Sequence, residues 1–251
     1  MKMNFSDLLP KHRPFLFSEL QLPVPLVVAV LAPHPDDFDA IGVTLHKLHQ
    51  QGHVIHLAVL TTGANGIEDG WKGLHDASAK VLVREAEQQA SCEFFGLPAK
   101  HLSFLRLWQR SGADVSPDSD ARDKETLRGY LHATRPDLVF LPHGNDSNPT
   151  HRRTYETFCE IAVRDGMTVL ACLNQDAKTG DMRADMYTCF GEEEAAWKAQ
   201  LLRFHRSQQE RNLAARGYGF DERVLKVNRD AAMKAGGNQP YAEVFELQQF
   251  G

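Results

Sequence analysis

Two short segments of the chain gather the residue types that bind catalytic metal ions. One segment, 33–39, reads PHPDDFD, and the other, 142–151, reads PHGNDSNPTH. Catalytic zinc takes three nitrogen or oxygen ligands and keeps a further position open for water. His34 and Asp37 are three residues apart at a tight turn, so both can converge on one ion, and His151 can supply the third ligand. The pattern therefore predicts a metal site made by His34, Asp37 and His151.

Asp36 needs a different task, because two adjacent aspartates cannot easily share one face of an ion. A metal ion lowers the pKa of its bound water to about 7, and a carboxylate base then suffices at neutral pH. We therefore predict that Asp36 is the general base. The alternative is that Asp36 or Asp39 only caps a helix, since aspartate is common at that position, and that the histidines lie in a surface loop.

The two segments can meet only if the strands before them are neighbours in a sheet. Apolar runs bounded by polar loops predict strands at 26–32, 53–61, 101–107, 137–141, 168–173 and 241–247. Helical spacing predicts helices at 39–51, 77–95, 122–133, 151–165, 192–207 and 221–234. Strands that alternate with helices in this way indicate right-handed βαβ units and an α/β fold.

The expected architecture is a doubly wound, mostly parallel sheet with helices on both faces. With the common strand order 3-2-1-4-5, the order reverses between the first and fourth strands, and ligands bind at such a switch point. Both His/Asp segments follow these two strands, so they should face the same crevice. We expect one domain over 1–251, with 1–25 as an N-terminal extension and 175–251 completing the domain.

Composition narrows the class of protein. The 251 residues carry a formal net charge of −5, which disfavours a nucleic-acid partner. The longest apolar run is too short to cross a bilayer, and the first residues lack the apolar stretch of a secretory signal, so we expect a cytoplasmic protein without a membrane partner. No heptads or apolar stripe indicate a protein partner, so a homo-oligomer is neither predicted nor excluded.

The motifs of two other classes of protein are absent from the chain. The turn after the first strand contains no glycine, which excludes the GxGxxG turn of dinucleotide-binding proteins. The chain contains no GxSxG, which argues against a serine hydrolase of the α/β-hydrolase type.

Several motifs together resemble the PIG-L/LmbE family of zinc-dependent N-deacetylases. They are His34-Pro35-Asp36-Asp37, Gly42–Leu45, Thr61-Thr62-Gly63, Arg84–Glu87, Arg135-Pro136-Asp137, Pro149-Thr150-His151, His205–Gln208 and Tyr241–Glu243. The resemblance implies a Rossmann-like fold and hydrolysis of a linear amide, the N-acetyl group of a small amino sugar or its conjugate. By the same resemblance His34, Asp37 and His151 match the family's zinc ligands and Asp36 its base. Iron, cobalt or manganese also suit such a mixed site.

The second motif departs from the family pattern, which commonly reads His-Pro-Asp-His. Here Asn148 and Thr150 stand in place of the first histidine and the aspartate. Asn148 can donate a hydrogen bond to an oxyanion but cannot donate a proton, so His143 or Asp146 are candidates for that role. Loss of one oxyanion donor typically costs 10²–10³ in rate. The alternative function is therefore a catalytically silent protein of the same fold that binds a metal or a sugar.

A few further residues have two possible roles. Arg84 and Thr62 are candidate substrate contacts, as is Asp146; for Arg84 the alternative is an ion pair with carboxylates of the protein. His205 can assist the site as a buried polar neighbour or be a structural histidine with its hydrogen bonds satisfied.

Overall fold

The computed structural model describes residues 5–108 and 117–251, which form an α/β fold around one eight-stranded sheet. The sheet order is β1-β7-β8-β6-β5-β2-β3-β4. The strands are β1 (Phe15–Leu16), β2 (Val27–Ala32), β3 (Val54–Val59), β4 (Leu102–Phe104), β5 (Leu138–Pro142), β6 (Val169–Asn174), β7 (Met186–Phe190) and β8 (Tyr241–Phe250). All neighbouring strands pair in parallel except β8, which runs antiparallel to both β6 and β7.

The central strands follow the order predicted from the sequence. β4, β3, β2, β5 and β6 correspond to the expected order 3-2-1-4-5, and the reversal lies between β2 and β5. β2 consists of apolar residues throughout because both of its faces are covered. Its neighbours β3 and β5 fix its register, in which Ala29 lies opposite His56 on one side and Val139 on the other.

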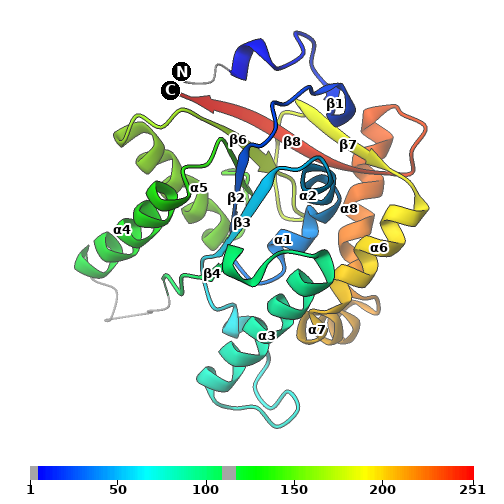
Figure 1. The fold of residues 1–251 in the computed structure, drawn as a ribbon. Coiled ribbons are helices and arrows are strands. Elements are labelled where there is room, and N and C mark those ends of the chain that lie inside the picture. Colours follow the sequence, from blue (N-terminus) through cyan, green and yellow to red (C-terminus); the bar gives the residue numbers. More distant parts are fainter. Residues whose placement is uncertain (1–4, 109–116) are drawn as a thin grey trace.

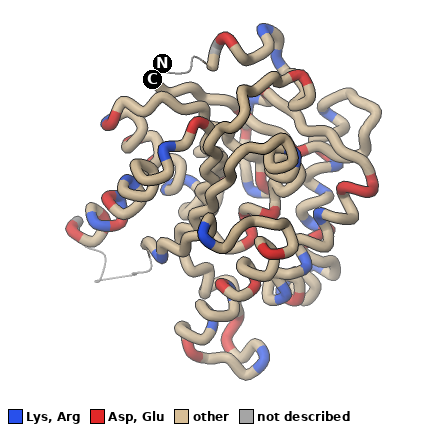
Figure 2. Tube along the Cα trace, viewed as in Figure 1, with Lys and Arg blue, Asp and Glu red and all other residues tan. Residues whose placement is uncertain are grey.

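Helices cover both faces of the sheet (Figure 1). They are α1 (Asp37–Ala40), α2 (Gly42–Gln50), α3 (Ala77–Phe95), α4 (Pro117–Thr134), α5 (Pro149–Arg164), α6 (Glu192–Arg203), α7 (Arg206–Arg216) and α8 (Phe220–Ala235). Short 3₁₀ helices lie at Phe5–Asp7, Phe17–Glu19, Ala64–Gly66 and Ala99–His101. Among the described residues, no helix combines the length and the apolar character that crossing a membrane requires. Lys and Arg alternate with Asp and Glu along α4 (Figure 2).

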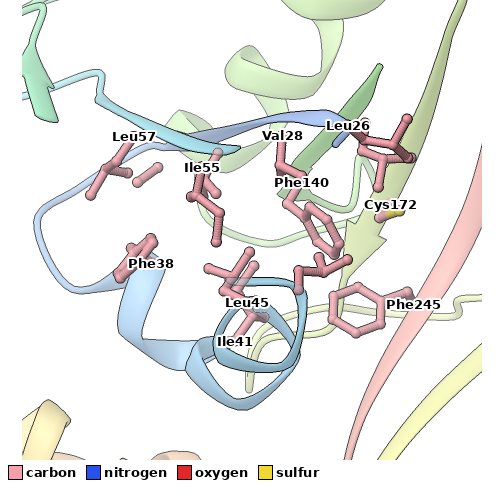
Figure 3. Close-up of a cluster of buried hydrophobic side chains, with 14 of the residues drawn as sticks. Leu26, Val28, Phe38, Ile41, Leu45, Ile55, Leu57, Phe140, Cys172 and Phe245 are labelled. Carbon is pink, nitrogen blue, oxygen red and sulfur yellow. The ribbon is translucent and has the colours of Figure 1, made fainter. Parts of the chain in front are cut away.

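Two apolar clusters, one on each face, hold these layers together. On one face, side chains of α1 and α2 pack under the central strands, and Figure 3 shows Phe38 and Leu45 facing Val28 and Phe140. On the other face, α4 and α5 pack on the alternate residues of the same strands, such as Leu31. The alternation of side chains along each strand divides the core in this way.

The structure differs from the sequence-based prediction in several elements. The helix expected at 39–51 is divided into α1 and α2, and the one expected at 192–207 ends at Arg203. His205 has a non-helical backbone (φ −80°, ψ 64°) and separates α6 from α7. Strands β1 and β7 were not predicted, because the apolar alternation in them is too short to stand out from a loop.

A buried ion pair joins the last helices to α2. Lys198 on α6 lies 2.7 Å from Glu243 on β8, and both side chains are almost completely buried. Glu243 in turn accepts hydrogen bonds from the backbone N–H groups of Val43 and Thr44 at the start of α2. Lys198 also donates to Asn228 on α8. The pair therefore connects α2, α6, α8 and β8.

Candidate metal centre

The two His/Asp segments meet at the carboxyl edge of the sheet, where the strand order reverses. His34 lies in the loop after β2, and Asp37 is the first residue of α1. His151 lies in the first turn of α5, which follows β5. Because β2 and β5 are hydrogen-bonded neighbours, the loops that follow them face each other. The structure thus brings together the three residues that the sequence predicted as ligands.

The ligand atoms of these three residues lie close enough to hold one ion. A ring nitrogen of His34, a ring nitrogen of His151 and a carboxylate oxygen of Asp37 all lie within 4.8 Å of one another. The His151 Nε2 atom is 3.6 Å from Asp37 Oδ1, and His34 Nδ1 is 3.2 Å from Asp37 Oδ2. The His34 backbone N–H also donates to Asp37 Oδ2 at 2.7 Å. The turn therefore orients Asp37 before any ion binds.

The donor set fits zinc. Two imidazoles and one carboxylate are the ligands of many catalytic zinc sites, which keep a further position open. The side chains of His34 and Asp37 are 26% and 22% exposed, whereas that of His151 is 5% exposed. The group therefore opens to solvent on the side of His34 and Asp37, where water or a substrate can approach.

The charges around the group favour a cation. Burial raises the pKa of Asp37, but the neighbouring His151 and hydrogen bonds from His34 outweigh this effect and lower the pKa to about 2. Burial lowers the pKa of His151, but Asp37 and Asp146 outweigh it and raise the pKa to about 9. Carboxylates on two sides thus stabilise positive charge at His151.

Asp36 lies in a strained turn that α3 holds in place. Its φ of 111° is in the left-handed region that non-glycine residues rarely adopt. The Asp36 backbone N–H donates to Gln88 Oε1 at 2.9 Å, and the Arg84 guanidinium donates to the carbonyl of Pro35. Gly63, with φ 62°, lies against the same turn, because a Cβ there would meet the Pro35 ring at 2.8 Å.

The Asp36 carboxylate is paired on one side only. Its Oδ2 accepts a hydrogen bond from Arg84 Nη2 at 2.8 Å, and its Oδ1 has no hydrogen-bond partner within the described part of the chain. Burial raises the pKa of Asp36, with the charge of Asp37 adding to the increase and that of Arg84 opposing it. A carboxylate whose pKa is raised, with one oxygen left without a partner, is suited to accept a proton.

The structure places Arg84 behind Asp36 rather than at an open surface. Its side chain is 2% exposed, and its guanidinium contacts Asp36, Glu87, Ser207 and the Pro35 carbonyl. The expectation of a substrate contact is therefore replaced by the ion pair with protein carboxylates. Thr62, the other candidate on this side, lies half-buried in the loop after β3.

A buried pair next to this turn was not predicted from the sequence. The Asp39 carboxylate accepts hydrogen bonds from His205, Ser91 and Gln88, and neither Asp39 nor His205 is exposed. His205 is therefore a buried polar neighbour of this turn, but it is not a histidine with all of its hydrogen bonds satisfied, because its Nδ1 has no partner among the described residues. Arg84, Gln88 and Ser91 share one face of a helix, and this polar face is the sequence feature that could have indicated the buried pair.

On the other side of His151, Asp146 is directed at the ring rather than at solvent. Its Oδ2 lies 3.2 Å from His151 Nδ1, and its Oδ1 accepts from the Asn148 backbone N–H at 2.7 Å. Thr179, in the loop after β6, also donates to Asp146 Oδ2 at 3.3 Å. The Asp146 side chain is fully buried. Its expected contact with substrate is thus replaced by contacts that position His151.

Asn148 and His143 occupy different environments. Asn148 caps α5, with its Oδ1 accepting from the Thr150 backbone N–H at 3.0 Å, and it lies half-buried three residues before His151. His143 is directed elsewhere: its Nδ1 accepts from the Asn145 backbone, and its Nε2 lies 3.4 Å from Glu246 on β8. The structure therefore directs His143 toward Glu246, whereas Asn148 lies at the start of the helix that carries His151.

With this geometry established, comparison with known proteins identifies the family. The family model of PIG-L, GlcNAc-PI de-N-acetylase, matches residues 29–162, which is more than half of the chain and includes all three candidate ligands. The chain belongs to the PIG-L family. The matched region ends within α5, so α6, α7 and α8 lie outside it.

Solved deacetylases share the fold of this PIG-L member. One is the N,N′-diacetylchitobiose deacetylase of Pyrococcus horikoshii, with a TM-score of 0.71, 19% identity and coverage of 90% of this chain and 85% of that one. Another is the teicoplanin deacetylase Orf2 in its zinc-inhibited form, with a TM-score of 0.65, 16% identity and coverage of 89% and 98%. At such identities the likeness establishes the fold.

One curated relative is similar in sequence. It is a putative glucosamine-6-phosphate deaminase-like protein of Bacteroides thetaiotaomicron, 25% identical over 52% of this chain. The match covers 26% of that protein, so the chain spans about a quarter of its length.

Proposed function

We propose that this protein is a metal-dependent hydrolase that removes the N-acetyl group from an amino sugar or an amino-sugar conjugate. The observation that carries the proposal is the convergence of His34, Asp37 and His151 at the switch point, with the Asp36 carboxylate beside them. The family membership supports the reaction. The names of the diacetylchitobiose deacetylase and of the curated relative refer to amino sugars, which supports the substrate class.

In this proposal His34, Asp37 and His151 hold the ion, with zinc as the first candidate and Fe²⁺, Co²⁺ or Mn²⁺ as alternatives. A bound zinc ion would polarise the amide carbonyl and acidify the attacking water. Asp36 accepts the proton of that water through its Oδ1 and then passes it to the departing amine. The ion pair with Arg84 holds the Asp36 carboxylate in position while the proton moves.

Asn148 is the proposed donor to the oxyanion that forms during the attack. Its Oδ1 is occupied at the helix cap, which leaves the amide N–H₂ group free to donate. His143 was the other candidate, but its pairing with Glu246 directs it away. A neutral amide stabilises an oxyanion without donating a proton, so Asp36 must carry the proton transfers alone.

The second candidate function is a silent family member that binds a metal or a sugar without turnover. The observation that favours it is the replacement of the family's usual histidine and aspartate by Asn148 and Thr150. The contact between Asp146 and His151 argues against a silent protein. Asp146 supplies a carboxylate next to the ligand histidine, although it comes from another position in the same loop.

The test combines metal content with release of acetate. Purified protein is stripped, reloaded with zinc and assayed on a panel of N-acetylated sugars and conjugates. The proposal expects about one ion per chain, release of acetate from at least one substrate, and loss of both in His151→Ala. His12→Ala removes a histidine that is 62% exposed and is the matched control. Metal binding without any turnover would favour the silent member, and a protein that takes up no metal would exclude both the metal site and the proposed mechanism.

A further inference from the structure

The guanidinium group of Arg84 is held at both of its terminal nitrogens. Its Nη2 donates to Asp36 Oδ2 at 2.8 Å and to the carbonyl of Pro35. Its Nη1 lies 3.1 Å from Glu87 Oε2 and 3.4 Å from Ser207 Oγ. The side chains of Arg84 and Glu87 are 2% and 8% exposed. A buried guanidinium therefore contacts two carboxylates, of which only Asp36 has a role in the proposed mechanism.

Glu87 is itself fixed by the first turn of α7. Its Oε1 accepts from the Ser207 backbone N–H at 2.7 Å, and its Oε2 accepts from the Ser207 hydroxyl at 2.8 Å. The first N–H groups of a helix have no partner inside the helix, and a carboxylate at that end is favourable. These contacts give Glu87 a structural role at the junction of α3 and α7, and any role in the reaction must come through Arg84.

The guanidinium can transmit this anchorage to Asp36. It is planar and rigid, so contacts that hold Nη1 also fix the direction of Nη2. The Nε atom of Arg84 has no partner within the described residues, which leaves Glu87 and Ser207 as the contacts that complement Asp36 and Pro35. Glu87 is also a second counter-charge, so the buried guanidinium does not depend on Asp36 alone.

We propose that Glu87 is a positioning residue for Asp36 and acts through Arg84. With the guanidinium held by Glu87, Asp36 Oδ2 keeps its partner, and the carboxylate stays oriented with Oδ1 free to accept a proton. Because Ser207 fastens Glu87, the support of the base extends to α7, which lies outside the region 29–162 matched by the family model. This inference rests on the proposed deacetylation, in which Asp36 is the base.

Two glutamates of α3 offer a matched pair of variants. Glu87→Met keeps the length of the side chain and removes both acceptor oxygens. Glu85→Met makes the same change two positions earlier, where the side chain is 10% exposed and accepts from Arg106 at 2.7 and 2.8 Å. Each variant loses an ion pair with an arginine, and Glu87 is the one that contacts Arg84.

The first measurement is the steady-state kinetics of zinc-loaded protein on N,N′-diacetylchitobiose and N-acetylglucosamine. We expect Glu87→Met to lower kcat roughly 10–100-fold, because a small misplacement of a reacting group has effects of this size. KM and zinc content should not change, because the base acts in the transition state and is not a ligand. Glu87→Gln, which retains one acceptor oxygen, should lose less, and Glu85→Met should keep the kcat of the unaltered protein.

A double variant shows whether Glu87 acts through Arg84. Arg84→Met should lower kcat at least as much as Glu87→Met does. Adding Glu87→Met to Arg84→Met should then cause no further loss, because residues that act through one contact are not additive. Circular dichroism and zinc content of each variant show whether it has folded.

A further measurement does not depend on turnover. The guanidinium N–H groups of Arg84 are buried and hydrogen-bonded, so in isotope-labelled protein they should give separate NMR signals that exchange slowly with water. Arg84→Met identifies these signals by their absence. They should exchange faster in Glu87→Met and should be unaltered in Glu85→Met.

Several outcomes would overturn the positioning role of Glu87. They are an unchanged kcat in Glu87→Met, equal losses in Glu87→Met and Glu85→Met, and losses that add in the double variant. Arg84 signals that are unaltered in Glu87→Met would overturn it whatever the activity. If the unaltered protein releases no acetate, the proposed deacetylation is contradicted, and faster exchange of the Arg84 signals in Glu87→Met would still support the anchorage of Arg84 by Glu87.

Discussion

His151 lies between two carboxylates, with its Nδ1 atom 3.2 Å from Asp146 Oδ2 and its Nε2 atom 3.6 Å from Asp37 Oδ1. An Nδ1–H that donates to Asp146 leaves Nε2 with the lone pair that a metal ion needs. In metal sites, such a carboxylate behind a histidine fixes the tautomer and the ring orientation. The loop after β5 thus supplies both the ligand and the group that orients it.

Replacing Asp146 should weaken metal binding without removing a ligand. We expect Asp146→Asn to lower zinc affinity about 10–100-fold, because the ring loses its charged neighbour and one of the two carboxylate oxygens becomes an amide N–H₂ group that cannot accept. Competition with a chelator of known affinity measures the change. Asp181→Asn, an exposed aspartate on the facing loop, is the charge-matched control and should bind zinc as before. Equal affinities in the two variants would show that Asp146 does not position His151.

Replacing Asp36 should separate metal binding from turnover. Asp36→Asn keeps the size of the side chain and its contact with Arg84 but removes the base. General-base catalysis contributes typically 10²–10⁴-fold, so acetate release should fall by about that factor. Zinc content, measured by elemental analysis, should stay near one ion per chain. Turnover at the original rate would remove Asp36 from the role of base.

The sequence was sufficient to predict the order of the five central strands and the convergence of the three candidate ligands, because both depend on local signals. The apolar run at 26–32 and the polar residues after it are visible in the chain itself, and the order of parallel strands follows common rules. The helix expected at 77–95 has those bounds in the structure, since Asp76 caps its start and Gly96, with φ 89°, ends it.

The contacts behind the ligands could not be predicted, because they depend on side chains that meet only in three dimensions. Asp39 and His205 are 166 positions apart and meet because α6, which ends just before His205, packs against α1 and α3. Arg84 was a candidate substrate contact, and nothing in the sequence of its helix indicates that it forms an ion pair with Asp36. The contact between the loop after β6 and α8 likewise joins segments more than forty positions apart.

The buried pair of Lys198 and Glu243 should contribute strongly to stability. Lys198→Met leaves the Glu243 carboxylate buried without its counter-charge, and breaking such a pair costs about 3–5 kcal/mol. We expect a loss of that order in the free energy of unfolding, measured by urea denaturation. The double variant Lys198→Met/Glu243→Gln should recover part of the loss, because no buried charge remains. Lys226→Met, at an exposed site, should unfold as the unaltered protein does; if Lys198→Met does so too, the pair is not stabilising.

His53 should make the protein less stable in mild acid. Its Nδ1 accepts a hydrogen bond from the Leu26 backbone N–H at 3.1 Å, and its Nε2 is buried without a partner among the described residues. Burial lowers the pKa of His53, with Asp137 opposing. The unfolded chain, where histidine has a pKa of about 6.5, therefore binds the proton more readily than the folded protein does. The free energy of unfolding should fall as pH drops below about 6.5 and stop falling below the folded pKa.

The variant His53→Gln isolates this contribution. Gln keeps an oxygen that can accept from Leu26 but does not titrate, so its free energy of unfolding should depend less on pH. A single proton changes the free energy of unfolding by at most about 1.4 kcal/mol per pH unit. Urea denaturation from pH 8 to pH 5 measures the slope for the unaltered protein, for His53→Gln and for His75→Gln, an exposed histidine. Other buried histidines add to all three slopes alike, so the difference between the two variants reports on His53 alone, and parallel curves would contradict the assignment.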